Sequence, residues 1–208
     1  LQKASKSGTP LVLIDRFFEG VNLPYISSND FEGSLEATQY LINYGHKKIA
    51  CFQGIVGTSP NNQRVNGYKQ ALKINKIPFD PTLVIGEDFG FNNGYTCAKK
   101  LIKHLAKSKI TAIISMGNQI TLGILKALKE EGVQIPNDLS IISFDEQEYS
   151  DLLYTPLTTV SHMNENIGDV ALKMLFNQFG KSTRIKPKNV VLNSKLIIRA
   201  SVKKIGPG

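Results

Sequence analysis

The chain has 208 residues, of which 41% are hydrophobic, so it can bury a sizeable core as one large domain or two small ones. No apolar run approaches the roughly 20 residues that a membrane span requires, and the chain does not start with a signal-peptide pattern. The net charge is +8, but it comes mostly from Lys residues spread along helix-like segments, which favours a solubilising surface over a DNA-contacting patch.

Short apolar runs alternate with longer helical segments along the chain. Most of the runs are apolar throughout, as expected for parallel strands that are covered on both faces. In chain order, strands are expected at residues 11–14, 49–52, 83–85, 112–115, 140–144 and 158–161. Helices are expected between and after them, at residues 30–44, 63–75, 93–106, 120–131 and 165–179.

The residues at the ends of these segments are typical of helix boundaries. Gly45 and Gly132 follow two of the expected helices, where a left-handed C-terminal cap is usual. Asn118 and Asn164 stand where N-caps are expected, and Asn29 begins the helix at 30–44. Alternation of strands and helices at this spacing predicts an α/β fold with doubly wound parallel sheets and helices on both faces.

Ligands of such sheets bind beyond the carboxyl ends of the strands. Carboxylates and guanidinium groups bind pairs of hydroxyls, and an aromatic ring covers the apolar face of a sugar. Groups of these kinds follow the expected strands, at Asp15-Arg16, Gln53-Gly54, Phe89, Gly117-Asn118 and Asp145-Glu146. The pattern therefore favours a polyhydroxylated ligand.

Sequence signatures of common enzymes are absent, including phosphate-binding glycine loops, the nucleophile elbow and the zinc-protease motif. His46 is expected to pack or cap, His104 to be solvated, and His162 alone lies near acids. Asp15 and Asp145 would suit acid–base chemistry, but nothing in the sequence supplies a nucleophile or a metal beside them. The chain is therefore not expected to be an enzyme, and no catalytic residue, metal ligand or cofactor is assigned.

Cys51 and Cys97 are the only cysteines, and nothing near them has the spacing of metal ligands. Two thiols in a chain of this length indicate reduced, buried residues in a cytoplasmic protein rather than a disulfide framework.

Several segments resemble, in order along the chain, the effector-binding core of the lactose-repressor (LacI/GalR) family of bacterial transcriptional regulators. That core also resembles periplasmic sugar-binding proteins. The matching segments are PLVLIDR (10–16), YLINYGHKKIACFQG (40–54), RVNGYKQAL (64–72), GYTCAKKL (94–101), TLGILKALKEEGVQIPNDLSIISFDE (121–146), TPLTTV (155–160) and LIIRAS (196–201).

The resemblance implies two Rossmann-like subdomains of the periplasmic-binding-protein-like type I fold, joined by three crossovers, with the effector between them. Residues 1–28 and 162–191 would form the N-terminal subdomain, which is incomplete. Residues 29–161 and 192–203 would form the C-terminal subdomain. The DNA-binding helix-turn-helix headpiece and the opening strands of the first subdomain would lie outside this chain.

The resemblance also implies a set of effector-binding residues. Asp15 would accept hydrogen bonds from sugar hydroxyls, Arg64 would be a bidentate donor, and Asp145 would hold ring hydroxyls from the second subdomain. Phe89 would stack on the sugar. The full set is Asp15, Arg64, Phe89, Phe91, Asn118, Asp145 and His162.

Two departures from the family pattern affect this set. The family commonly has Asn-Asp where this chain has Gly117-Asn118, so Asn118 either supplies the missing contact from one position later or the contact is lost. The acid pair is Asp145-Glu146 rather than two Asp, and the second acid is expected to cap or brace.

Some of these residues also allow simpler structural roles. Asp15 could pair with Arg16, and Arg64 could form a surface ion pair. Phe17 and Phe18 are expected to pack where the subdomains meet. Three glycines are expected at close-packed positions, namely Gly33, Gly67 and Gly94.

The segments GEDFGFNNGY (86–95) and SPNNQRVNGY (59–68) look most like the ribose-operon branch of the family. They imply a homodimeric repressor of a sugar-utilisation operon that binds ribose or another small sugar and, through its headpiece, operator DNA. A purine effector or a phosphoprotein corepressor remains open. The second candidate function, from a different functional class, is sugar binding for a transport system, and an enzymatic function is the third.

Overall fold

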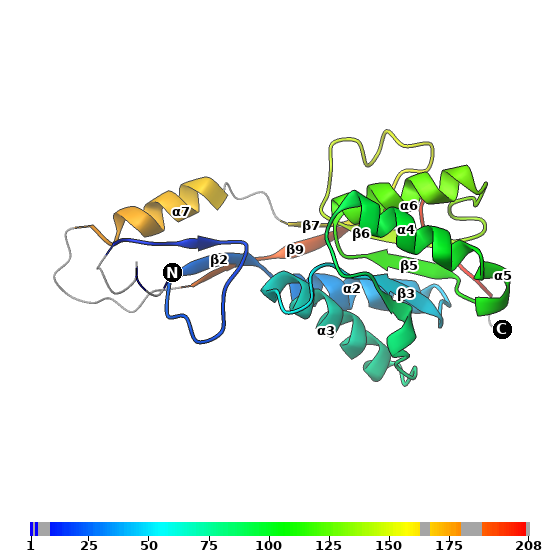
Figure 1. Cartoon of the computed structure of the whole chain (residues 1–208), viewed down its shortest axis with the longest axis horizontal. Coiled ribbons are helices and arrows are strands. Elements are labelled where there is room, and N and C mark those ends of the chain that lie inside the picture. Colours follow the sequence, from blue (N-terminus) through cyan, green and yellow to red (C-terminus); the bar gives the residue numbers. More distant parts are fainter. Residues whose placement is uncertain (2, 4–8, 163–166, 180–188, 207–208) are drawn as a thin grey trace.

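The computed structural model describes residues 1, 3, 9–162, 167–179 and 189–206. These residues form two β-sheets, one of three strands and one of six. Figure 1 shows them as a small lobe and a large lobe that lie side by side along the longest axis of the molecule. The described chain changes sheet after β2, after β7 and after β8, so three passages connect the lobes.

The small lobe contains a parallel sheet that is covered by one described helix, α7 (Ile167–Phe176). Ile26, Ala171 and Leu192 are its buried apolar residues, and they join the sheet to the helix. The strand order is β1 (Leu13–Ile14), β2 (Tyr25–Ser28) and β8 (Val190–Leu192). The sequence did not predict β2 or β8, because YISS is half polar and VVL is too short to be distinctive.

The large lobe contains a sheet in which all neighbours are parallel except the last pair, β7 and β9. Its strands, in spatial order, are β4 (Val84–Ile85), β3 (Ile49–Phe52), β5 (Ala112–Ser115), β6 (Ser140–Phe144), β7 (Thr158–His162) and β9 (Ser194–Ile197). The predicted strands of this lobe are confirmed to within one residue at each end, and β9 is an additional strand.

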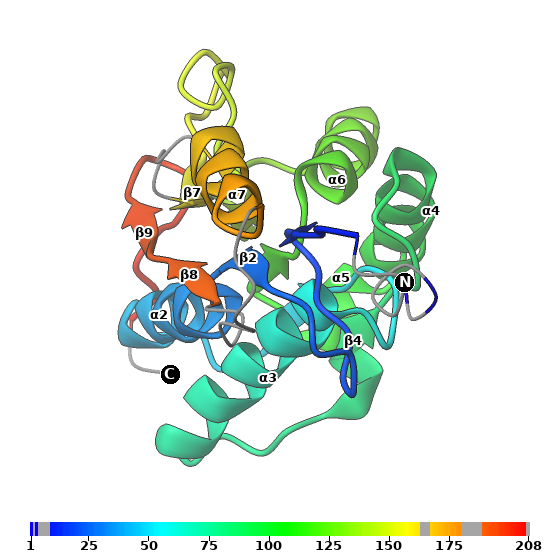
Figure 2. The ribbon, with the colours of Figure 1, turned by 90° about the vertical axis from the view of Figure 1, so that its left-hand side faces the viewer.

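The central strands of the large lobe are buried on both faces, as their continuous apolar sequences predict. In β3, Ile49 and Cys51 point into the core beneath one helix pair, whereas Ala50 and Phe52 point into the core beneath the other. Figure 2 shows the two pairs on opposite sides of the sheet. The pairs are α2 (Asp30–Asn43) with α3 (Ser59–Ile74), and α4 (Phe91–Ile102) with α6 (Asn118–Glu130). The α/β class with helices on both faces is therefore confirmed.

Several helix boundaries differ from the prediction, including the end of α7, which lies at Phe176 rather than at residue 179. Helix α3 begins at Ser59 rather than at residue 63, because Pro60 fits the first turn of a helix. The segment predicted as one helix at residues 93–106 is divided into α4 and the short α5 (Leu105–Ser108). Gly117, rather than Asn118, is the N-cap residue of α6. The N-cap predicted at Asn164 lies outside the described residues.

Other expectations about single residues are confirmed. Gly45 and Gly132 follow α2 and α6 with φ values of +95° and +69°. The buried His46 ring lies 2.9 Å from Thr111 Oγ1 and 3.1 Å from the carbonyl oxygen of Lys203, so it is a packing residue. Both cysteines have free thiols, and Cys51 is buried as expected, whereas Cys97 is only half-buried, which corrects the prediction for that residue.

The three expected glycines lie at close-packed positions: Gly67 and Gly94 where two helices approach each other, and Gly33 where α2 meets Val160 and Ser194 of the sheet. A Cβ atom at Gly94 would lie only 2.1 Å from the carbonyl oxygen of Ile120. We expect Gly94→Ala to push α4 away from α6 and to lower the free energy of unfolding by about 1–3 kcal/mol, measured by urea denaturation.

Gly206→Ala is the matched control, because a Cβ atom at Gly206 would meet nothing within 4 Å. Equal stability of the Gly94→Ala and Gly206→Ala variants would contradict the close packing of α4 on α6.

Candidate functional site

Charged residues from both lobes meet beyond the carboxyl ends of the parallel strands. Asp15 follows β1 of the small lobe, whereas Asp145 follows β6 of the large lobe. Asp15 is close enough for its negative charge to contribute to raising the pKa values of Arg64 in α3 and Asp30 in α2 of the large lobe. The lobe junction therefore contains one shared electrostatic site.

Arg64 is the buried centre of this site, with 5% of its surface exposed. Its Nε–H donates to Oδ1 of Asp30 at 2.8 Å, and its Nη1–H donates to the carbonyl oxygen of Met116 at 2.6 Å. The guanidinium carbon lies 4.5 Å from the ring centroid of Phe144, so an aromatic face covers the cation. A role for Arg64 in a mere surface ion pair, which the sequence left open, is wrong.

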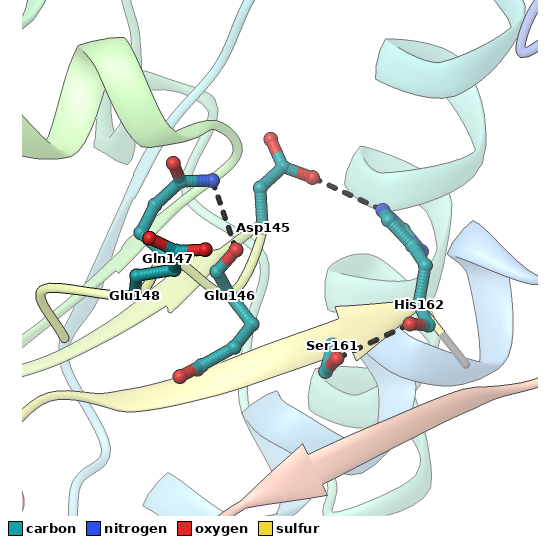
Figure 3. A pocket seen from close by; sticks show the side chains of 6 residues that line it. All are labelled: Asp145, Glu146, Gln147, Glu148, Ser161 and His162. Carbon is teal, nitrogen blue, oxygen red and sulfur yellow. Dashed lines mark hydrogen bonds and ion pairs between the residues drawn. The ribbon is translucent and has the colours of Figure 1, made fainter. Parts of the chain in front are cut away.

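Asp145 and His162 complete the cluster. Nη2 of Arg64 lies 3.5 Å from Oδ1 of Asp145, and Nε2 of His162 lies 3.0 Å from the same oxygen. Figure 3 shows the Asp145 and His162 side chains pointing toward each other from the ends of neighbouring strands. They line a hollow of about 450 Å³ together with Glu146, Gln147, Glu148 and Ser161.

The cluster keeps Asp145 ionised. Burial alone would raise the pKa of Asp145, but the Arg64 guanidinium and the His162 hydrogen bond together lower it below the usual value for an aspartate. Burial raises the pKa of Asp30, and the Arg64 guanidinium partly offsets that effect. At neutral pH, Asp145 is thus a hydrogen-bond acceptor at the lobe junction.

Glu146 points away from this cluster and braces the strand ends. Its carboxylate accepts two hydrogen bonds from Arg199, at 2.7 and 3.0 Å, and a third from Thr159 Oγ1. The expectation that the second acid of the pair braces is confirmed.

Asp15 and Asp145 share an unusual backbone geometry. Both adopt left-handed conformations, with φ values of +67° and +69°. The N–H of Asp15 donates to the carbonyl oxygen of Ile26 at 2.8 Å, and the N–H of Asp145 donates to that of Val160 at 3.0 Å. A left-handed conformation strains most L-residues, although Asp tolerates it better than most. The same sharp turn therefore presents a carboxylate from each lobe.

Phe89 is wedged between two strand ends of the large lobe. A Cβ atom at Gly54 would lie 2.3 Å from its ring, and one at Gly117 would lie 3.3 Å from it. The guanidinium carbon of Arg16, from the small lobe, lies 5.9 Å from the ring centroid. The predicted stacking residue is therefore at the lobe junction, where its ring contacts both lobes. No ion pair between Asp15 and Arg16 is formed in the described part of the chain.

Phe91 and Asn118 are placed differently from the other predicted residues. The Phe91 ring stacks on Tyr95 with centroids 6.3 Å apart and borders a separate hollow beside Glu87 and Asp88. The Asn118 side chain accepts a hydrogen bond from the N–H of Gln119 at 2.7 Å. Only the backbone N–H of Asn118 acts on Asp145, where it contributes to the lowered pKa.

A third hollow, of about 490 Å³, opens where the loop after β1 faces the start of α3. The Phe17 ring stacks on Tyr25 with centroids 4.7 Å apart, and the Phe17 N–H donates to Oγ of Ser59 at 3.0 Å. Phe17 thus packs at the lobe junction, as predicted. Phe18 is 51% exposed and lines the hollow instead of packing between the lobes, which corrects the prediction for this residue.

Asp30 is the main site residue that the sequence did not identify. It was assigned only to a helix start, and its neighbour Asn29 does cap α2 by accepting from the N–H of Glu32 at 3.4 Å. A buried arginine requires an acid, but the sequence does not show which of the acids lies beside Arg64.

Within the residues that the structure describes, no group of three or more His, Cys, Asp or Glu is arranged to hold a metal ion. The helices of the same part of the chain are all too short or too polar to span a membrane.

The chain matches the model of the periplasmic binding protein-like domain family over residues 38–202. The HTH-type transcriptional repressor PurR of Vibrio atlanticus (strain LGP32) is 30% identical over 194 residues, which cover 93% of this chain and 57% of that repressor. The ribose operon repressor of Haemophilus influenzae is 31% identical over 193 residues, with the same two shares. The chain thus spans about 57% of the length of these relatives.

Solved structures of regulators have the same fold. A putative LacI transcriptional regulator from Bacillus cereus subsp. cytotoxis superposes with a TM-score of 0.89 at 27% identity, covering 99% of this chain and 72% of that one. A complex of the transcriptional regulator CelR with cellobiose gives a TM-score of 0.87 at 26% identity, covering 96% and 61%.

A strand-end site between two α/β lobes is the arrangement expected of a binding protein rather than of a barrel or a bundle. The chain belongs to the periplasmic binding protein-like domain family. Within that family it is an effector-binding core of the LacI/GalR type.

Removal of the Arg64 charge is expected to destabilise the protein. Arg64→Met leaves the Asp30 carboxylate buried without its partner, so we expect the free energy of unfolding to fall by about 3–5 kcal/mol in urea denaturation. Adding Asp30→Asn removes the unpaired charge and should recover most of the loss. Lys47→Met, at an exposed cation, is the control and should leave stability unchanged. A double variant no more stable than Arg64→Met would contradict this electrostatic account.

Proposed function

We propose that this chain is the effector-sensing and dimerisation core of a bacterial transcriptional repressor, with a small sugar bound between its lobes. The observation that carries the proposal is the convergence of Asp15 from the small lobe with Arg64 and Asp145 from the large lobe. A ligand that contacts all three groups must bridge the lobes.

The chemistry of these groups suits a polyhydroxylated ligand. Ionised carboxylates accept hydrogen bonds from hydroxyl pairs, and charged hydrogen bonds of this kind are stronger than neutral ones. Arg64 has five N–H groups, of which some already bind Asp30 and Met116, and the others face Asp145 and His162. In the proposal, sugar hydroxyls take over part of this last contact, and the Phe89 ring packs against the apolar face of the sugar.

Ribose is the proposed effector. The ribose operon repressor of Haemophilus influenzae is among the relatives, and the structural neighbour CelR was solved with cellobiose. Another small sugar or a purine would use the same acceptors and donors.

Ligand binding would act by changing the orientation of the two lobes relative to each other, which three segments of the chain connect. A sugar that contacts both lobes favours one lobe arrangement by its differential affinity, and coupling energies of this kind are commonly about 1–3 kcal/mol. In the proposal, a headpiece outside this chain senses the arrangement and binds operator DNA in the cytoplasm. The rival function, sugar binding for transport, is less well supported because the relatives reported above carry repressor names.

A surface of the large lobe supports homodimer formation. Leu152 and Tyr154 lie in the loop between β6 and β7, and Leu152 is 81% exposed while Tyr154 is fully exposed. Neighbouring large apolar side chains that face solvent are typical of a covered surface. In the proposal, the same loop of a second copy covers them.

The effector is tested by thermal unfolding of the full-length protein with ribose, other pentoses, hexoses and purines. A ligand at 100 times its Kd should stabilise the native state by about 2.7 kcal/mol, which raises the melting temperature by several degrees. We expect this rise with ribose in the unmodified protein and in Asp151→Asn, which changes an exposed carboxylate of the same loop between β6 and β7. It should be absent in Asp145→Asn.

A response to another sugar alone would reject ribose and keep the sugar site. No response to any compound would reject a small-molecule effector in favour of a phosphoprotein corepressor.

The dimer surface is tested by sedimentation of the full-length protein. We expect Leu152→Asp to weaken dimer formation at least about tenfold, since it places a charge in an apolar contact. Ile74→Asp changes an apolar residue that is 56% exposed elsewhere on the large lobe, and it should have no effect. Equal dimer affinity of the two variants would contradict the assignment of this surface.

A further inference from the structure

Three buried hydroxyl groups lie next to the strand ends of the candidate site. Ser115 ends β5, Thr121 lies in the first turns of α6, and Ser143 lies near the end of β6. Their exposed fractions are 0%, 3% and 2%. Thr121 Oγ1 is the middle member, at 2.8 Å from Ser115 Oγ and 2.6 Å from Ser143 Oγ.

The hydroxyl groups hold two backbone carbonyls. Ser143 Oγ donates to the carbonyl oxygen of Phe144 at 2.8 Å. The carbonyl oxygen of Gly117 lies 2.9 Å from Thr121 Oγ1 and 3.2 Å from Ser115 Oγ. The N–H of Thr121 also donates to the Gly117 carbonyl, at 3.0 Å. These carbonyls belong to the peptide groups that precede Asp145 and Asn118. A peptide group is planar, so fixing its carbonyl also fixes the direction of its N–H.

The count of protons makes the three groups interdependent. Each hydroxyl has one proton to donate. Three protons cannot serve all these contacts at once, so the hydroxyls share them. Thr121 Oγ1 is the one group that contacts both serines and also the Gly117 carbonyl. Loss of the Thr121 hydroxyl therefore removes the link between Ser115 and Ser143.

The opposite ends of both peptide groups face the site. The N–H of Asp145 donates to the carbonyl oxygen of Val160 at 3.0 Å and holds the residue in its left-handed conformation, at φ +69°. The N–H of Asn118 acts on the Asp145 carboxylate itself. A Cβ atom at Gly117 would lie 3.9 Å from Oδ2 of Asp145, so the two turns are in contact.

We propose that Ser115, Thr121 and Ser143 are positioning residues, which fix the Asp145 carboxylate and the start of α6 for ligand binding. The inference rests on the proposed function for its effect on affinity, but the placement of the two peptide groups does not depend on the ligand. A purely structural network would change stability alone.

The test compares Thr121→Val, which removes the hydroxyl while keeping a similar shape, with Thr121→Ser, which retains it. Calorimetry of the full-length protein with ribose should show about tenfold weaker binding for Thr121→Val, or ~1.4 kcal/mol, and near-normal binding for Thr121→Ser. Thr38→Val is the matched control, because Thr38 is fully buried and its hydroxyl has no partner among the described residues.

A second readout needs no ligand. The backbone amide resonances of ¹⁵N-labelled Asn118 and Asp145 should move in Thr121→Val and stay in place in Thr121→Ser and Thr38→Val. A lower melting temperature of Thr121→Val with unchanged amide resonances and unchanged affinity would overturn the proposal. If ribose does not bind the unmodified protein, the proposed effector is wrong, and the amide resonances alone decide the positioning role.

Discussion

The rest of the site depends on one buried cation. The guanidinium of Arg64 is almost inaccessible to water, and a charge in such a place is tolerated only with close compensation. Each compensating group lies on a different element, namely Asp30 at the start of α2, the Met116 carbonyl after β5 and Asp145 after β6. The electrostatic requirement of one side chain therefore fixes the relative positions of the elements that present the acids to the cleft.

Around this centre, the fold follows from apolar sequences that are easy to recognise. IACF and AIIS have few alternatives to a strand buried on both faces, and their order along the chain, with helices between them, determines the large lobe. The strands that escaped prediction carry weaker information. YISS is half polar, and SKLI contributes to the sheet only by pairing antiparallel with the distant β7. Such pairing depends on tertiary contacts, which local patterns do not contain.

The residues of the candidate site also fall into two groups, those that the sequence indicated and those that it did not. Asp15, Phe89 and Asp145 were found because residues at the ends of parallel strands share one edge of a sheet, and the family resemblance added Arg64 and His162. Asp30 and the hydroxyls of Ser115, Thr121 and Ser143 were not found. Their roles arise from pairings across 34 residues in one case and 22 residues in another, and serine in a strand has no signature that separates a network from ordinary packing. Phe91 is the opposite case. It was included in the predicted set, but its ring stacks on Tyr95 rather than lying at the lobe junction with Phe89.

The left-handed backbone at Asp15 and Asp145 implies a conflict between the stability of the fold and the binding of a ligand. Glycine would adopt these φ values without strain, so each aspartate costs the native state about 1 kcal/mol or less relative to it. Selection for thermal stability alone would thus favour glycine at position 15, whereas Asp145 is also retained by its pairing with the buried Arg64. In a directed-evolution experiment on this scaffold, glycine at position 15 would mark a lineage that has gained stability and lost a carboxylate of the ligand site.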